Sequence, residues 1–97
     1  MKPTPLGHHE IAERLATLPG WHHHGKVLER VFDRGDFNGS LHFVNAVGEA
    51  ANKANHHPDI TIQWNRVTLT LSSHDAGGLT QRDFDLAKTI DALANPE

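Results

Sequence analysis

Histidine is the side chain in this sequence that offers the most chemistry, because nine histidines occur in 97 residues and cysteine is absent. Imidazole changes its charge near neutral pH and also binds metal ions, so proton transfer and metal binding are both open to the chain. Without cysteine, disulfide bonds and thiolate zinc sites are excluded, and any metal would need histidine or carboxylate ligands. The spacing of the histidines then decides which of them can act together.

Three of the histidines are predicted to meet at one corner of the fold. His56 and His57 stand before Pro58, which cannot continue a helix and biases His57 toward an extended backbone. His74 follows the second of two strand patterns, which are joined by Asn65-Arg66. A two-residue link suits a tight hairpin, and a turn at this point places His74 opposite His57 at the open end.

The segment after the second of these strands adds polar groups to the same corner. Ser73 supplies a hydroxyl, Asp75 supplies a carboxylate, and Ala76 with the two glycines that follow it supplies accessible backbone N–H groups. Asp83 lies at the start of the next helical pattern, where it can serve as a helix cap or as a residue of a site.

Hydrophobic spacing predicts the elements that must position these residues, in the order α-β-β-α-β-β-α. The expected elements are a helix from His8 to Thr17, a hairpin over 20–24 and 26–34, a long helix from about Asp36 to Asn55, two strands over 60–64 and 67–71, and a last helix capped by Thr80. Two hairpins separated by a helix favour an α+β fold, with one four-stranded antiparallel sheet and helices packed on one of its faces.

The composition limits the class of protein. A chain of 97 residues suits a single domain, here 1–97, and the mean hydropathy of -0.51 together with the lack of a long apolar run argues against a membrane protein. The net charge is -3 and the basic residues are scattered, so no surface for nucleic acid is expected. The first residues lack the apolar core of a signal peptide, and we therefore expect a cytoplasmic location.

The corner residues resemble the signature of the pterin-4a-carbinolamine dehydratase family in both type and spacing. The signature segment consists of His56-His57-Pro58, five residues, Trp64, nine residues, His74, eight residues and Asp83. Further stretches that resemble the family are 18–21, 36–38 and 78–83. The resemblance covers nearly the whole chain, and it implies a fold similar to the predicted one and assembly into homodimers or homotetramers.

The resemblance also implies an activity. Family members remove water from a 4a-hydroxytetrahydropterin to give the quinonoid dihydropterin, in the recycling of tetrahydrobiopterin, and they need neither a cofactor nor a metal. It implies acid–base catalysis by His56, His57 and His74. Pterin is expected to contact residues from the set Pro58, Ser73, Asp75, Ala76, Asp83, Asn52 and Trp21.

One position departs from the family pattern. The family usually carries an acidic residue four positions before the first site histidine, where this chain has Asn52. An amide can hydrogen-bond to an imidazole but cannot accept its proton, so we expect an altered rate and pH profile, with Glu49 as a partial substitute one helical turn earlier.

Two other functions stay open from the sequence. Asn52 leaves room for a non-catalytic dimerising or protein-binding module on the same fold. A histidine-rich metal-binding protein is a third reading, although the side chains of His22, His23 and His24 alternate between faces on a strand and cannot all hold one ion.

Overall fold

A computed structural model describes residues 4–95 and confirms the predicted α+β architecture and element order. A single turn of 3-10 helix, η1, precedes the last α-helix. The elements are α1 (His8–Leu15), β1 (His22–His24), β2 (Val27–Asp33), α2 (Phe37–Ala54), β3 (Asp59–Gln63), β4 (Arg66–Leu71), η1 (His74–Ala76) and α3 (Gln81–Ala94).

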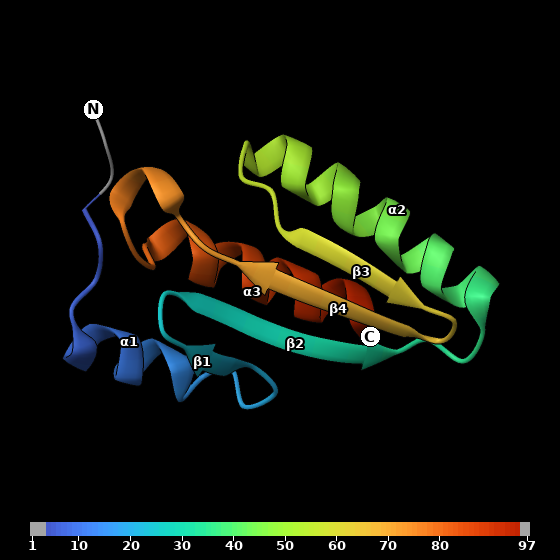
Figure 1. Cartoon of the computed structure of the whole chain (residues 1–97), viewed down its shortest axis with the longest axis horizontal. Helices are drawn as coiled ribbons and strands as arrows, with labels where there is room; N and C mark the ends of the chain where they lie inside the picture. Colours follow the sequence, from blue (N-terminus) through green and yellow to red (C-terminus); the bar gives the residue numbers. More distant parts are fainter. Residues whose placement is uncertain (1–3, 96–97) are drawn as a thin grey trace.

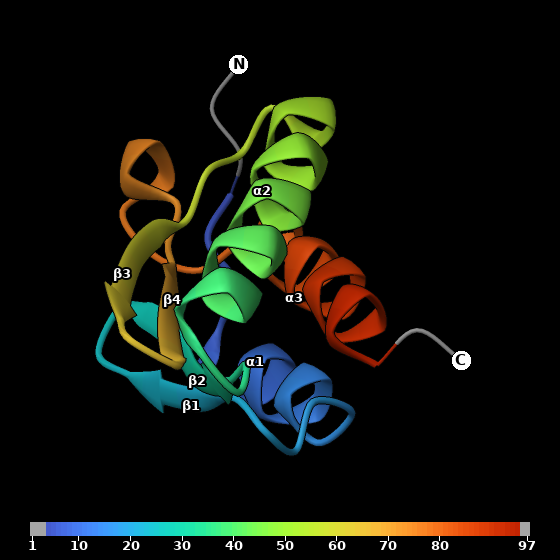
Figure 2. The same ribbon diagram turned by 90° about the vertical axis from the view of Figure 1, so that its right-hand side faces the viewer.

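The four strands form one antiparallel sheet in the order β1-β2-β4-β3, so β1 and β3 lie at its edges. All three α-helices lie on the same face of this sheet, as the two orthogonal views show (Figures 1 and 2). The helix α2 runs along β3, and α3 packs beside α2 over the middle of the sheet. No helix of the described residues, 4–95, covers the other face of the sheet.

The core lies between the sheet and the helices, and the alternation of each strand explains which side chains enter it. On β4 every second residue is buried, and on β2 Leu28 and Phe32 are buried whereas Val31 between these positions is exposed. In the helices, apolar residues recur every three or four positions, so they share one face, and this face packs against the strands. The core includes Leu28, Phe32, Val67, Leu69, Leu71, Phe43, Val47, Phe84, Ala87 and Ile90.

The register of the second hairpin differs from the predicted one. Gln63 pairs with Arg66, so the turn consists of Trp64 and Asn65 and begins one residue earlier than expected. Asn65 is fixed there because its side-chain amide donates to Asp33 Oδ1 over 2.9 Å. Trp64 takes the left-handed conformation, with φ of 54°. In this register His74 does not pair across from His57, and it lies on η1 beyond the end of β4.

The first helix and the first strand are shorter than predicted. α1 ends at Leu15 rather than Thr17, because the N–H groups of Thr17 and Leu18 turn to the carbonyls three residues earlier and tighten the chain. Trp21 N–H then bonds to the Leu18 carbonyl in a further turn, so β1 starts only at His22.

Between residues 4 and 95 there is no helix with the length and apolar character needed to cross a membrane.

Candidate active site

The C-terminus of α2 turns His56 into the protein. Asn55 caps the helix in the left-handed conformation, with φ of 51°, a conformation that asparagine tolerates better than most residues. The N–H of His56 then bonds to the carbonyl of Ala51 over 3.1 Å, which closes the helix end. As a result the His56 side chain is buried, with 8% of its surface exposed.

Asp83 is the centre of the hydrogen bonds at this end of the molecule. Its Oδ1 lies 2.5 Å from Nε2 of His56, and its Oδ2 accepts hydrogen bonds from the Ser73 hydroxyl (2.7 Å) and the Thr80 N–H (2.9 Å). The carboxylate is completely buried, so these groups rather than water stabilise its charge. Asp83 therefore joins the end of α2, the segment after β4 and the start of α3.

The double role of Asp83 explains why the sequence pattern fitted both a cap and a site. As predicted, Thr80 caps α3: its hydroxyl oxygen accepts a hydrogen bond from the Arg82 N–H. The Asp83 carboxylate in turn accepts a hydrogen bond from the Thr80 N–H. The second carboxylate oxygen stays available for His56. A helix cap and a histidine partner are thus supplied by the same side chain.

His57 points away from the core and pairs with the residue that departs from the family pattern. Its Nε2 lies 2.8 Å from Oδ1 of Asn52, and both side chains are exposed. An amide oxygen only accepts, so Nε2 of His57 is the donor in this hydrogen bond. Asn52 therefore orients the imidazole without adding a charge.

His74 lies at the same end of the molecule, on η1 (Figure 1). Its side chain is exposed, and its Nε2 is 3.1 Å from the Ser72 hydroxyl. The next residue, Asp75, accepts a hydrogen bond of 2.7 Å from Arg82 on α3. This hydrogen bond from the guanidinium holds the pKa of Asp75 below its ordinary value.

The structure gathers most of the predicted site residues but leaves one elsewhere. His56, Ser73 and Asp83 share one hydrogen-bond network, Pro58 directly follows His57, and Ala76 ends η1. Trp21 instead lies in the core, where its indole N–H donates to Asp91 Oδ1 over 2.9 Å and its ring packs edge-on against Phe32. Asp91 is two helical turns beyond Asp83, so Trp21 is not brought to this corner.

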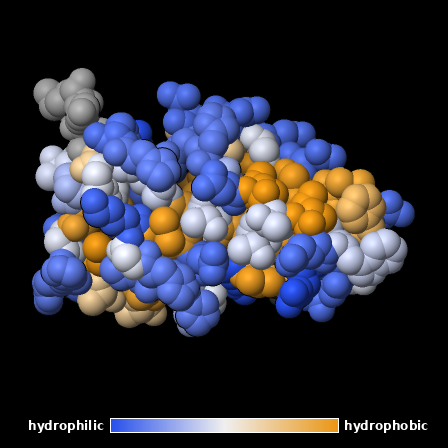
Figure 3. Space-filling view, viewed as in Figure 1, coloured by the Kyte–Doolittle hydropathy of each residue, from blue (hydrophilic) through white to orange (hydrophobic). Residues whose placement is uncertain are grey.

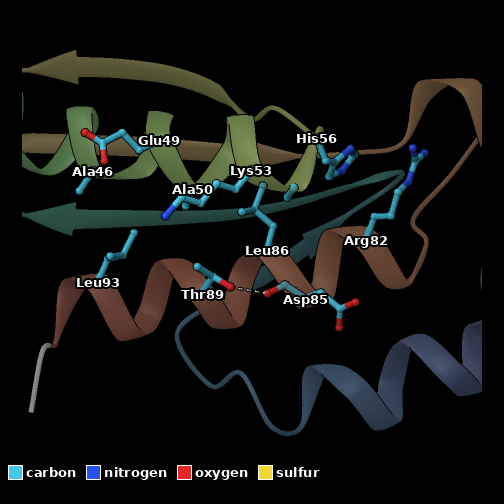
Figure 4. Close-up of a pocket in the computed structure, with 11 residues that line it drawn as sticks. Ala46, Glu49, Ala50, Lys53, His56, Arg82, Asp85, Leu86, Thr89 and Leu93 are labelled. Carbon is cyan, nitrogen blue, oxygen red and sulfur yellow. Dashed lines mark hydrogen bonds between the residues drawn. The ribbon is translucent and has the colours of Figure 1, made fainter.

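Two hollows flank the histidines. A groove of about 550 Å³ runs between α2 and α3 and ends at His56 and Arg82 (Figure 4). A smaller hollow of about 220 Å³ lies beside His74 and is lined by Lys26, Val27, Ser72, Ser73, Gly77 and Gly78 as well. Sequence reasoning missed Arg82 and Lys26. For Arg82 a signal was present, since a basic side chain in the first turn of a helix opposes the helix dipole.

In the part of the chain that the structure describes, the histidines are not grouped with one another or with carboxylates as a metal site requires. Among residues 4–95, no three histidine or carboxylate side chains come close enough together to hold a metal ion. The rings of His22 and His24 lie on the same side of β1 with their centroids 6.3 Å apart, while His23 bonds to the Gly25 carbonyl.

Comparison with known proteins identifies the class to which this fold and site belong. Residues 4–93 match the family described as "Pterin 4 alpha carbinolamine dehydratase". A protein of Thermosynechococcus vestitus is 53% identical over 85 residues, covering 88% of this chain and 90% of its own length. One from Acidobacterium capsulatum is 55% identical over 83 residues, covering 86% and 90%. Both carry the name "Putative pterin-4-alpha-carbinolamine dehydratase". The chain therefore belongs to the pterin-4a-carbinolamine dehydratase family.

Solved structures agree with this family. The crystal structure of a "transcriptional coactivator/pterin dehydratase" from Brucella melitensis superposes with a TM-score of 0.91 at 31% identity, covering 95% of this chain and 100% of that one. A pterin dehydratase-like protein described as a RuBisCO assembly factor in the alpha-carboxysome has a TM-score of 0.67 at 25% identity, covering 78% and 90%.

Proposed function

We propose that this chain is an active dehydratase, which converts a 4a-hydroxytetrahydropterin to the quinonoid dihydropterin and water. The observation that supports this proposal most directly is the network around Asp83. It fixes a buried histidine, His56, next to a segment that carries His74, while His57 stays exposed at the same end. Recycling of tetrahydrobiopterin is the role that this reaction serves.

The reaction needs two proton movements, and imidazoles suit both. The C4a–O bond breaks while the departing hydroxyl takes a proton to become water, and the ring nitrogen loses its proton to give the quinonoid product. Imidazole has an unperturbed pKa of about 6.5, so acid and base forms are both present near neutral pH. His57 and His74 are exposed and can reach a bound pterin, whereas His56 is shielded and contacts Asp83.

The first prediction is that the purified protein accelerates carbinolamine dehydration without added metal. His56 contacts the carboxylate of Asp83, His57 contacts the amide of Asn52, and no step of the proposed reaction involves a metal. Turnover of 4a-hydroxytetrahydropterin, followed by the ultraviolet absorption of the quinonoid product, should be the same with and without EDTA. Loss of turnover in EDTA that zinc restores would contradict this prediction.

A symmetric homodimer is the assembly that we propose, with β3 as the shared edge. β3 is an edge strand of five residues, and its outer N–H and C=O groups are free to pair with a second copy. Apolar surface lies between β3 and α2 (Figure 3). The exposed large apolar side chains of this region are Phe37, Leu41, Ile60 and Trp64.

We therefore expect a mass above that of the 10.7 kDa chain in light scattering, and a shift toward the monomer in Ile60→Lys. Val31→Lys is the matched control, because Val31 is also an exposed apolar strand residue but lies on β2, away from this edge. A mass of 10.7 kDa for the unmodified protein at every concentration rules out the dimer.

A protein-binding role on the same fold is the second candidate. The names of two structural neighbours favour it, since one is called a transcriptional coactivator as well as a dehydratase and the other a RuBisCO assembly factor. The turnover assay separates the candidates, because a binding module would fold normally and show no catalysis. A single domain and a cytoplasmic location stay predictions from the sequence.

A further inference from the structure

The turn that carries His74 has few connections of its own. The N–H groups of Ala76 and Gly77 bond to the carbonyl of Ser73, which closes η1. Gly77 then takes φ of 78°, and a second glycine follows it. The hydroxyl of Ser73 donates to buried Asp83, so it does not cap η1. Backbone hydrogen bonds shape the turn, but they do not tie its outer side to the rest of the protein.

A side chain from α3 makes that connection. Arg82 donates a hydrogen bond to Asp75 over 2.7 Å. Within residues 4–95, no other side-chain hydrogen bond joins η1 to another helix or strand. The His74 imidazole bonds only locally, to Ser72 two residues before it. In Figure 4 the Arg82 side chain extends from the start of α3 toward the segment that contains η1.

Stability alone does not explain this arginine. Arg82 lies in the first turn of α3, where the helix dipole favours acidic side chains and disfavours basic ones. The ion pair with Asp75 is partly exposed, at 37% and 50%, and exposed pairs contribute little to folding. The Nε atom of Arg82 is buried and has no hydrogen-bond partner among the described residues, which is itself unfavourable.

We propose that Arg82 is a positioning residue that holds His74 in its working place through Asp75. The inference rests on the proposed function, in which His74 takes part in proton transfer. In this proposal Asp75 has a structural role, because its carboxylate accepts the hydrogen bond from Arg82 that connects η1 to α3. The pKa of Asp75 below its ordinary value agrees with a carboxylate that stays ionised and paired.

The test uses Arg82→Gln, Asp75→Asn, their combination and Arg82→Lys in the full chain. We expect each of the first two to lower kcat by about 10-fold or more, because small displacements of a catalytic group are costly. The double variant should lose no more than one single variant, and Arg82→Lys should recover part of the rate. Arg14→Gln is the matched control, since Arg14 contacts Gln81 in the same turn of α3 but does not touch η1.

Two spectroscopic measurements test the positioning without relying on turnover. In Arg82→Gln the amide hydrogens of Ala76 and Gly77 should exchange faster, and the imidazole signals of His74 should shift, while those of His57 stay in place. Unchanged exchange and unchanged His74 signals would overturn the proposal, and so would faster exchange with an unaltered kcat in an active enzyme. If the unmodified protein does not turn over, the proposed function fails, while the exchange measurement still shows whether Arg82 holds the turn.

Discussion

His57→Ala and His74→Ala are each expected to lower kcat by about 10²- to 10⁴-fold, the usual contribution of a general acid or base. Both side chains are exposed, and each makes one hydrogen bond to a nearby polar residue, Asn52 or Ser72. Their removal leaves no cavity in the core, so the thermal unfolding temperature should change little. A large loss of rate in a well-folded protein is therefore the signature of proton transfer by these imidazoles.

Steady-state kinetics with a thermal melt of each variant would measure both effects. The variant that lacks both histidines should lose less than the product of the two single losses, because residues that act on one transition state are not independent. His42→Ala is the matched control, as His42 is an exposed histidine on α2 outside this corner. If His57→Ala and His74→Ala both keep full turnover while folded, the active site lies elsewhere.

The sequence predicted the architecture well because its signals are local. Helical spacing and strand alternation depend on residues a few positions apart, and a cap such as Thr80 for α3 lies next to the element that it starts. The same holds for the end of α2 at Asn55 and Pro58. Errors appeared where neighbours in space decided the outcome, as in the turn at Trp64 and Asn65, which a contact with β2 fixes.

The internal division of the site could not be predicted from the sequence. Pro58 indicates that the side chains of the two adjacent histidines point in different directions, but nothing in the sequence indicates that His56 is buried and His57 is exposed. The contact between His56 and Asp83 joins residues 27 positions apart, and no periodicity encodes it. Spacing therefore identified the residues of the corner, while tertiary packing determined which of them are buried and which are exposed.

Asn52 shows how the structure sharpens an expectation from the sequence. The position was singled out because an amide replaces the usual acid, and the side chain does contact a site histidine, namely His57. Glu49, expected as a partial substitute, lines the groove between α2 and α3 instead of bonding to either histidine of the pair. Asn52 therefore orients His57 by a hydrogen bond, but it does not place a negative charge beside the imidazole as an acidic residue at this position would.

The largest effect on stability is expected for Asp83→Ala. The change removes the partner of buried His56 together with the acceptor of the Ser73 hydroxyl and the Thr80 N–H. Breaking a buried pair by deleting one member commonly lowers the free energy of unfolding by about 3–5 kcal/mol, because the groups left behind are buried without partners. Since small domains are stable by only about 5–15 kcal/mol, this loss is a large fraction of the total stability.

Urea unfolding at neutral pH would measure this effect, with Asp85→Ala as the control. Asp85 lies on the same helix, but its side chain is exposed and accepts a hydrogen bond from the side chain of Gln81, so its loss should change the free energy of unfolding by less than about 0.5 kcal/mol. The double variant Asp83→Ala/His56→Ala should lose less free energy of unfolding than the sum of the two single variants, because neither partner is then left buried without the other. An Asp83→Ala protein that unfolds at the same urea concentration as the unmodified protein would show that the network does not hold this corner together.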